Sequence, residues 1–282
     1  MTKKRFLSEN LVDEYVKWLW KEEKSCATIK KYQRDVLCFI HFAEGREVRK
    51  DVVIQYKEQL IQKNYAISSV NSMLVALNGL FTYLGWEECK VKTMRIQRQV
   101  YCPECKELSR EEYLHLVAVA QAKEDVRMAL LLQTVCSTGI RISELPYITV
   151  EAVLAGETTV YCKGKSRKII LVSAIQKQLY KYMEERGIRT GPIFITKKGK
   201  PIDRSNIWRE MKKLSLEAGI SVEKVSPHNL RHLFARTFYE ADKDIAKLAD
   251  VLGHSNIDTT RIYIITTENA HRKCMESLQL TI

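Results

Sequence analysis

Five short segments in the second half of the chain carry side chains suited to hold and cleave a phosphate ester. They are T-G-I-R-I-S-E-L at 138–145, C-K-G-K-S-R-K at 162–168, S-P-H-N-L-R-H at 226–232, L-G-H-S at 252–255 and T-T-R-I-Y at 259–263. Between them they offer guanidinium, ammonium, imidazole and phenol groups. This set is sufficient for phosphoryl transfer without a metal ion, because cations can stabilise the developing charge and a phenol can act as the nucleophile.

The arginines and the tyrosine define the chemistry most sharply. Arg141 and Arg231 are planar guanidinium forks, and each can bind two oxygens of one phosphate. His228 lies three residues before Arg231, so the two share one face of a helix. A free tyrosine has a pKa of about 10, so Tyr263 needs a basic group to help it lose its proton. An acid must also protonate the leaving oxygen.

Two further cations complete the candidate set. Lys163 is predicted to lie at the mouth of a hairpin turn, where a mobile loop can carry it to a ligand, and His254 follows Gly253 at a predicted helix end. Each segment alone has an ordinary structural explanation, namely a surface ion pair, a solvated turn or a core tyrosine. The prediction therefore rests on the combination of the segments and their order along the chain.

The elements that must position these residues are mostly helices. Apolar residues recur at helical spacing near residues 11–19, 29–43, 51–63 and 70–84, with Ser25 or Thr28 predicted to cap the second of these helices and Ser68 and Ser69 preceding the fourth. Residues 1–89 are thus predicted to form a small domain of about four helices. The basic segment 90–107 breaks the periodicity and contains a proline, so we interpret it as an interdomain linker.

The remainder, 108–282, is predicted to be a mostly helical domain with a small antiparallel sheet. Ser109 and Glu112 form a capping-box pattern that starts one helix. Two β-prone runs at 158–162 and 168–172 flank the turn K-G-K-S-R, as a hairpin would. The other helices are predicted at about 124–138, 173–186, 206–218, 229–240 and 242–252.

Composition favours a soluble protein that binds a polyanion. Hydrophobic residues make up 45% of the chain and the formal net charge is +12, of which residues 1–100 and the rest each carry +6. Two basic bodies suit a clamp around nucleic acid, since each cation near a phosphate releases condensed counterions. The eight cysteines are scattered, as in a reduced cytosolic protein, and no signal peptide or membrane-spanning apolar run is predicted.

The five segments together resemble the tyrosine recombinases, or phage integrases, and most closely their short two-domain Xer-type members. T-G-I-R-I-S-E-L resembles the first arginine box, which makes Arg141 a phosphate-binding arginine and Glu144 the acidic residue that supports the site. C-K-G-K-S-R-K resembles the β-hairpin motif of the family. Lys163, directly before Gly164, aligns with the catalytic lysine without a gap, and Lys165 is the alternative.

The remaining three segments resemble the rest of the family's active site. S-P-H-N-L-R-H resembles the His-x-x-Arg box and supplies His228, which would handle the tyrosine proton, and Arg231. The family usually has Asp where Asn229 stands. Asn at this position lacks one negative charge, but no catalytic role is lost with it. L-G-H-S supplies His254, and T-T-R-I-Y supplies the nucleophile, Tyr263.

The resemblance implies a mechanism and a fold. Tyr263 would attack the scissile phosphate to form a 3′-phosphotyrosine, Arg141, Arg231 and His254 would hold the phosphate, and Lys163 would protonate the departing 5′ oxygen. The bond energy is kept in the covalent intermediate, so neither ATP nor a metal or other cofactor is expected. The implied fold is a helical, SAM-like core-binding domain joined to a catalytic domain of the DNA breaking-rejoining type.

The resemblance also implies partners and a setting. The partners are double-stranded DNA with a specific recombination site and further copies of the chain, which form a homotetramer on two DNA sites and pass through a Holliday junction. A directionality factor is a further possible partner. The implied setting is the cytoplasm and nucleoid of a bacterium, or a phage or mobile element within one. The tail, about 268–282, has Cys274, Met275 and Leu278 at helical spacing and would dock on a neighbouring subunit or on its own domain.

Three alternatives remain open from the sequence. A type IB topoisomerase uses similar chemistry but rejoins the same strand. A recombinase relative that has lost catalysis would only bind DNA as an accessory factor, but no catalytic residue type is missing here. A zinc module on Cys102 and Cys105 would need two more ligands, and no second C-x-x-C pair follows.

Overall fold

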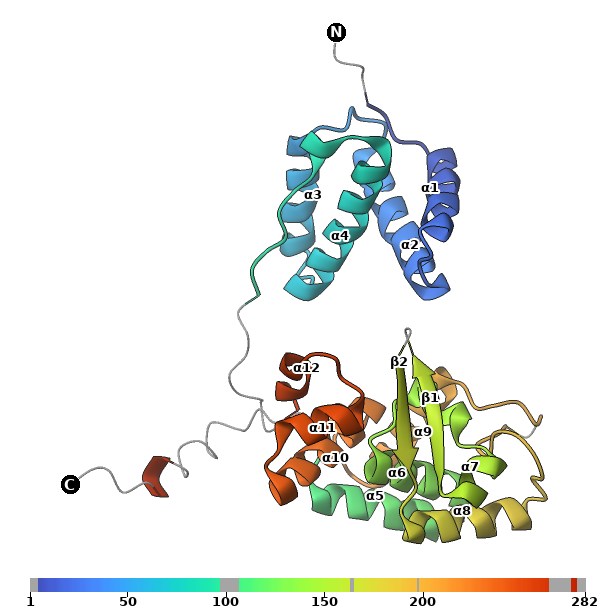
Figure 1. Ribbon diagram of the computed structural model, residues 1–282. Coiled ribbons are helices and arrows are strands. Elements are labelled where there is room, and N and C mark those ends of the chain that lie inside the picture. Colours follow the sequence, from blue (N-terminus) through green and yellow to red (C-terminus); the bar gives the residue numbers. More distant parts are fainter. Residues whose placement is uncertain (1–4, 97–106, 163–164, 197, 264–274, 278–282) are drawn as a thin grey trace. The chain divides into compact units, whose positions relative to one another are not determined.

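In the computed structural model the chain divides into two compact units, Met1–Arg98 and Gln99–Ile282. The structure describes residues 5–96, 107–162, 165–196, 198–263 and 275–277. The first unit is helical, and the second combines helices with one β-hairpin (Figure 1). The prediction of a mainly helical protein with a small antiparallel sheet is therefore confirmed.

The first unit consists of four helices around an aromatic and aliphatic core. Its elements are α1 (Glu9–Lys21), α2 (Cys26–Ala43), α3 (Lys50–Gln62), α4 (Ile67–Leu84) and the short 3₁₀ helix η1 (Glu87–Cys89). Ser25 caps α2, as one of the two sequence alternatives predicted, and accepts a hydrogen bond from the backbone of Thr28. The fourth helix begins earlier than predicted, at Ile67 after Ala66, so Ser68 and Ser69 lie inside its first turn.

Helix α4 is the central element of this unit. By length and composition it could cross a membrane, but such a helix can equally be the core helix of a folded domain. Its residues Val70, Leu74, Leu77, Leu80 and Phe81 are buried in the core cluster of the first unit. One face of α4 thus packs in the core, whereas Ile67 and Val75 on the same helix are exposed.

The segment after η1 is fastened to α4 by two asparagines. The Asn78 side chain pairs with both the N–H and the C=O of Val91, and Asn71 does the same with Met94. Each amide thereby acts as a backbone partner for an extended strand. The first residues of the predicted linker 90–107 accordingly pack on the first unit, and 97–106 lie outside the described part.

The second unit has a helical core around one hairpin. Its elements are α5 (Arg110–Ala122), α6 (Val126–Thr138), η3 (Ile142–Tyr147), α7 (Val150–Ala155), β1 (Glu157–Cys162), β2 (Lys165–Ile170), α8 (Ser173–Glu185), α9 (Arg204–Glu217), α10 (Pro227–Asp242), α11 (Ile245–Leu252) and α12 (Ile257–Arg261). The predicted capping box is present, since Ser109 and Glu112 satisfy each other's backbone N–H groups at the start of α5. Helix α6, mostly buried, packs against α5, α8 and α10.

The hairpin differs in register from the prediction. Strand β2 begins at Lys165, and Cys162 pairs with Lys165, so Lys165, Ser166 and Arg167 belong to the strand rather than to the turn. The prediction was wrong because polar residues were taken as turn residues, whereas one face of this two-stranded sheet is exposed and accepts them. The shift matters because it places the Arg167 side chain inside the unit.

Candidate active site

Arg141 and Glu144 form the first part of the site at the start of η3. The Glu144 carboxylate accepts hydrogen bonds from the Arg141 backbone N–H at 2.9 Å and from its guanidinium at 3.0 Å. Glu144 is buried, whereas the Arg141 side chain is about one-third exposed, at 34%. Burial opposes ionisation of Glu144, but hydrogen bonds from Arg167 and Arg141 outweigh it and hold its pKa below the usual value. Glu144 therefore stays charged and fixes Arg141 with its guanidinium accessible.

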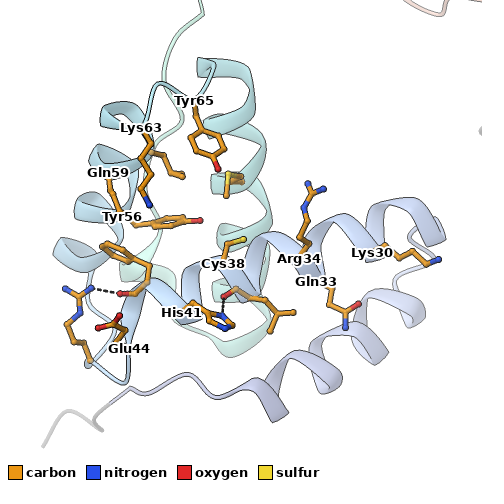
Figure 2. A pocket seen from close by; sticks show the side chains of 15 residues that line it. Lys30, Gln33, Arg34, Cys38, His41, Glu44, Tyr56, Gln59, Lys63 and Tyr65 are labelled. Atoms are coloured by element: carbon orange, nitrogen blue, oxygen red, sulfur yellow. Dashed lines mark hydrogen bonds between the residues drawn. The ribbon is translucent and has the colours of Figure 1, made fainter. Parts of the chain in front are cut away.

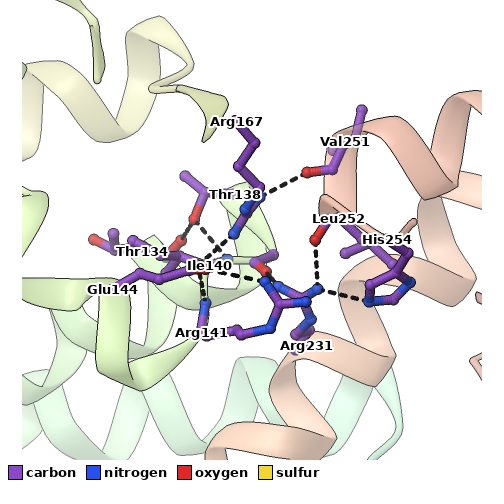
Figure 3. Close-up of polar contacts among 11 residues, drawn as sticks. Thr134, Thr138, Ile140, Arg141, Glu144, Arg167, Arg231, Val251, Leu252 and His254 are labelled. Carbon is purple, nitrogen blue, oxygen red and sulfur yellow. Dashed lines mark hydrogen bonds and ion pairs between the residues drawn. The ribbon is translucent and has the colours of Figure 1, made fainter. Parts of the chain in front are cut away.

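Arg167 adds a second guanidinium to this carboxylate. Its Nη2 donates to Glu144 Oε2 at 2.5 Å, and its Nη1 donates to the carbonyl oxygen of Val251 at 2.6 Å (Figure 3). The side chain is only 8% exposed. The sequence motifs assign no role to Arg167, although it lies in the hairpin motif, because its partners are distant in the chain.

Arg231 is the most deeply buried cation of the set. It projects from the first half of α10, donates to the carbonyl oxygens of Gly139 and, at 2.8 Å, Leu252, and contacts His254 Nε2 at 3.0 Å (Figure 3). Burial first, and then the positive charge of Arg141, lowers its pKa to about 10, which still leaves it charged at neutral pH. Gly139 has φ of +60°, and a Cβ there would collide with the Phe234 ring. A glycine is thus required where Arg231 reaches the end of α6.

The contacts of His254 determine its protonation state. Arg231 can only donate, so His254 Nε2 must accept, and Nδ1 then carries the proton and donates to Thr260 Oγ1 at 2.9 Å. Burial and the nearby cations, led by Arg231, lower the pKa of His254 to about 4. At neutral pH this histidine is consequently an uncharged ring of fixed tautomer.

Three imidazole rings surround Tyr263. Its ring centroid lies 5.7 Å from His228, 4.3 Å from His232 and 5.4 Å from His254, and 5.8 Å from the Arg231 guanidinium carbon. Tyr263 itself is 8% exposed and packs in a small apolar cluster with residues of α10 and α11. Tyr263 thus lies beside His228, which is predicted to take its proton, and beside His254 and Arg231, which are predicted to hold the phosphate.

His228 and His232 are one turn apart on α10 and contact each other. Their Nε2 atoms are 3.1 Å apart, so one ring donates and the other accepts. Burial is the main cause that lowers the pKa of both histidines, to about 4 for His232. His228 is therefore neutral in the folded protein and able to accept a proton. The sequence motif includes His232 but does not assign it a role.

The structure brings six of the seven predicted side chains into one region of the second unit. These are Arg141, Glu144, His228, Arg231, His254 and Tyr263. Lys163 lies outside the described residues, as do Cys102 and Cys105 of the zinc alternative and most of the predicted tail. Among the residues that are described, no group of three or more metal-ligand side chains is found.

A cavity of about 440 Å³ opens beside this cluster. Arg141, Glu144, Arg167, Gly253 and His254 are among its lining residues. Arg167 and Arg231 each have a buried Nε without a hydrogen-bond partner in the described part of the chain. Buried donors of this kind are costly unless paired, so the site offers positive charge and free N–H groups to an anion.

Comparison with known families decides what this arrangement belongs to. Residues 106–270 match the model of the phage integrase family, and residues 12–88 match the phage integrase N-terminal SAM-like domain. The chain belongs to the phage integrase family. The family resemblance predicted from the five segments is thus confirmed, and so is the SAM-like fold of the N-terminal domain.

Individual relatives extend over nearly the whole chain. The tyrosine recombinase XerA of Pyrococcus horikoshii is 27% identical, with 99% of this chain and 96% of that protein covered. Among solved structures, XerH site-specific recombinase bound to its difH substrate after cleavage is 20% identical with a TM-score of 0.74, covering 97% of this chain and 84% of that one. A lambda integrase tetramer bound to a Holliday junction is 17% identical with a TM-score of 0.74, covering 93% and 78%.

Proposed function

We propose that this protein is a site-specific DNA recombinase that cleaves and rejoins DNA strands through Tyr263. The observation that carries the proposal is the position of Tyr263 among His228, His254 and Arg231 in a chain of the phage integrase family. The family membership favours this function over a type IB topoisomerase or a non-catalytic accessory protein.

The reaction is a phosphoryl transfer in two balanced steps. The Tyr263 oxygen attacks the scissile phosphorus, the bond to the 5′ oxygen breaks, and a 3′-phosphotyrosyl ester forms. A 5′ hydroxyl of a partner strand then attacks that ester and releases the tyrosine. The number of phosphodiester bonds is conserved, so neither ATP nor a metal ion is needed for the energy balance.

The arginines bind the phosphate in this proposal. Arg141 presents a partly exposed guanidinium that Glu144 holds in place, and Arg231 retains a free Nε. His254 orients Arg231 in this structure, because its Nε2 accepts a hydrogen bond from that arginine. A direct hydrogen bond from His254 to the phosphate, as the sequence predicts, requires the ring to carry its proton on Nε2. The two arginines neutralise the charge that grows on the equatorial oxygens.

Proton transfers are assigned to the remaining groups. His228 accepts the Tyr263 proton. It is neutral at physiological pH, and so has a nitrogen able to accept, because burial and Arg231 lower its pKa. Lys163 protonates the 5′ oxygen, with Lys165 as the alternative. A substrate with sulfur in place of the bridging 5′ oxygen distinguishes Lys163 from Lys165 as the acid, because a thiolate leaves without being protonated. Lys163→Met should fail to cleave ordinary DNA but cleave the sulfur substrate, whereas Lys165→Met should cleave both.

The first unit, within 1–89, is proposed to bind DNA through a basic groove. The groove encloses about 900 Å³ between α2 and α3, and Lys30, Arg34, Arg46 and Lys63 contribute to its lining (Figure 2). Cations along such a groove suit a phosphate backbone. The linker 90–107 and the catalytic domain 108–282 complete the proposed organisation.

The partners proposed are a specific duplex site and further copies of the same chain. We include two DNA sites and a homotetramer that passes through a Holliday junction, because the chain resembles lambda integrase in fold. That protein has been solved as a tetramer bound to a Holliday junction. A directionality factor, a tail docked on a neighbouring subunit, and a cytoplasmic, nucleoid-associated location in a bacterium or its mobile elements belong to the same proposal.

Covalent capture tests the function directly. Wild-type protein, Tyr263→Phe and Tyr239→Phe are incubated with fragmented host DNA, denatured, and the protein-linked DNA is sequenced. Tyr239→Phe is a matched control because Tyr239 packs against the same apolar cluster as Tyr263. Adducts at one motif with wild type and the control, and none with Tyr263→Phe, are expected. Adducts that persist in Tyr263→Phe would refute the nucleophile, and dispersed adducts would favour topoisomerase activity.

A further inference from the structure

We propose that Arg167 is a positioning residue of the active site. It fixes the distance between the Arg141–Glu144 pair and the segment that carries His254. This inference rests on the proposed function, because it concerns how that site is assembled. Arg141 and His254 come from different parts of the second unit and must meet one phosphate. Something must therefore set their separation, and Arg167 is placed between them.

The contacts of Arg167 join the two sides of the site. Its Nη2 donates to Glu144 Oε2 at 2.5 Å, and Glu144 in turn holds both the backbone and the guanidinium of Arg141. Its Nη1 donates at 2.6 Å to the carbonyl oxygen of Val251, three residues before His254 (Figure 3). Because the guanidinium is planar and rigid, it transmits a fixed geometry from one contact to the other.

The backbone beyond Val251 is shaped to admit the arginine. Gly253 ends α11 with φ of +65°, and a Cβ at this position would collide with Arg167 Cδ and lie 3.2 Å from its Nε. A side chain here would displace the arginine as well as strain the turn. The glycine next to His254 thus serves the approach of Arg167 and the end of the helix together.

Electrostatics give Arg167 an effect that simple packing would not have. Burial penalises the charge of Glu144, and the hydrogen bond from Arg167 is the largest of the effects that oppose this penalty. The charged groups facing the carboxylate are Arg141 from its own segment and Arg167 from β2. Without Arg167 the pKa of Glu144 would rise, and a protonated Glu144 would hold Arg141 less firmly.

A second arginine of the same unit offers a matched control. Arg127 also bonds a carboxylate and a backbone carbonyl: its Nη2 is 2.9 Å from each oxygen of Glu210, and its Nη1 is 3.2 Å from the oxygen of Ile195. None of these residues belongs to the candidate active site. Replacing Arg127 therefore removes the same kinds of bond without touching the residues proposed to bind the phosphate.

The experiment compares full-length Arg167→Met with Arg127→Met. The substrate is a nicked duplex carrying the site recovered by covalent capture with wild-type protein, and the readouts are DNA affinity, the rate of covalent adduct formation and thermal unfolding. Arg167→Met should cleave about 100-fold more slowly at saturating protein, as expected for a small misplacement of catalytic groups, with little change in affinity. Equal cleavage rates for the two variants would overturn the inference.

The pH dependence separates positioning from packing. The defect of Arg167→Met should shrink as the pH is raised from 6 to 9, because Glu144 ionises again, and adding Glu144→Gln should cause little further loss. A defect that is constant with pH, or losses that multiply, would show that Arg167 does not act through the Glu144 carboxylate and would overturn the inference. If Arg167→Met does not fold, Arg167→Lys keeps the charge and should retain the wild-type pH profile at a reduced rate. Absence of adducts with wild-type protein would instead refute the proposed function.

Discussion

Each unit of this protein contains a buried carboxylate, and the two are supported in different ways. Asp35 and Glu144 are both 2% exposed. Asp35 is paired with Lys31 and Arg34, which are its neighbours on α2 and whose side chains are 34% and 71% exposed. Glu144 is paired with Arg141 and with Arg167, which comes from β2 and is itself buried.

The difference shows what each unit is built to do. Both cations that pair with Asp35 come from its own helix, and Lys31 also donates to the Ser72 carbonyl oxygen of α4. The Glu144 pair exists only when η3, β2 and α11 have assembled, and Arg231 is buried nearby. Buried charges add little stability, since desolvation offsets their attraction, but they are held rigidly. The second unit thus holds its buried carboxylate with cations from two elements, whereas both cations that pair with Asp35 lie on its own helix.

Removal of the buried arginine should have the largest effect. Arg231→Gln removes the charge that is proposed to stabilise the transition state, so cleavage should fall about 10³-fold. Arg34→Gln removes an exposed cation of the first unit, so it should weaken DNA binding and leave the rate of cleavage of bound DNA unaltered. Single-turnover cleavage at saturating protein measures the cleavage rate of both variants, and a DNA titration measures their affinity. A decrease of less than about tenfold for Arg231→Gln would break the comparison.

The two carboxylates should differ in their contribution to stability. Glu144→Ala leaves Arg167 buried without its partner and should cost about 3–5 kcal/mol. Asp35→Ala should cost about 1 kcal/mol, because Lys31 and Arg34 can turn to water. Urea unfolding followed by pulse proteolysis reports the two units separately. Similar values for both substitutions would mean that the Glu144 network is not specially coupled.

Acid should destabilise the second unit first. Burial lowers the pKa of His232 and His254 to about 4, below the value near 6.5 of an unfolded histidine. The unfolded state therefore binds protons first, and stability present above pH 6.5 is lost as the pH falls towards 4. The decrease is at most about 1.4 kcal/mol per pH unit for each histidine. The first unit holds one histidine, the exposed His41, and therefore no buried histidine.

The smallest effects are expected in the basic groove of the first unit. Lys30→Gln or Lys63→Gln should weaken binding to all DNA sequences alike and reduce the slope of log affinity against log salt by about 1 for each phosphate that is no longer neutralised. Lys181→Gln removes a lysine that is exposed on α8 and serves as the control. An unchanged salt slope in the groove variants would exclude this face from DNA binding.

Local features of the site were predictable from the sequence. The Ser109–Glu112 capping box and the Arg141–Glu144 spacing act over three residues, so sequence reading captures them. The position of Arg167 was not predictable, since its partners lie 23 and 84 residues away. Polar residues in a strand give no signal of which of them turns inward, and only the register of the hairpin decides it.

The placement of three key groups on one helix limits how this enzyme can vary over evolution. His228, Arg231 and His232 all project from α10. Each residue in an α-helix advances about 100° around the axis, so inserting or deleting one residue between Pro227 and His232 would turn part of the set away from Tyr263. A substitution at another position of this stretch keeps the spacing of the three side chains, whereas a single-residue insertion or deletion there should abolish DNA cleavage.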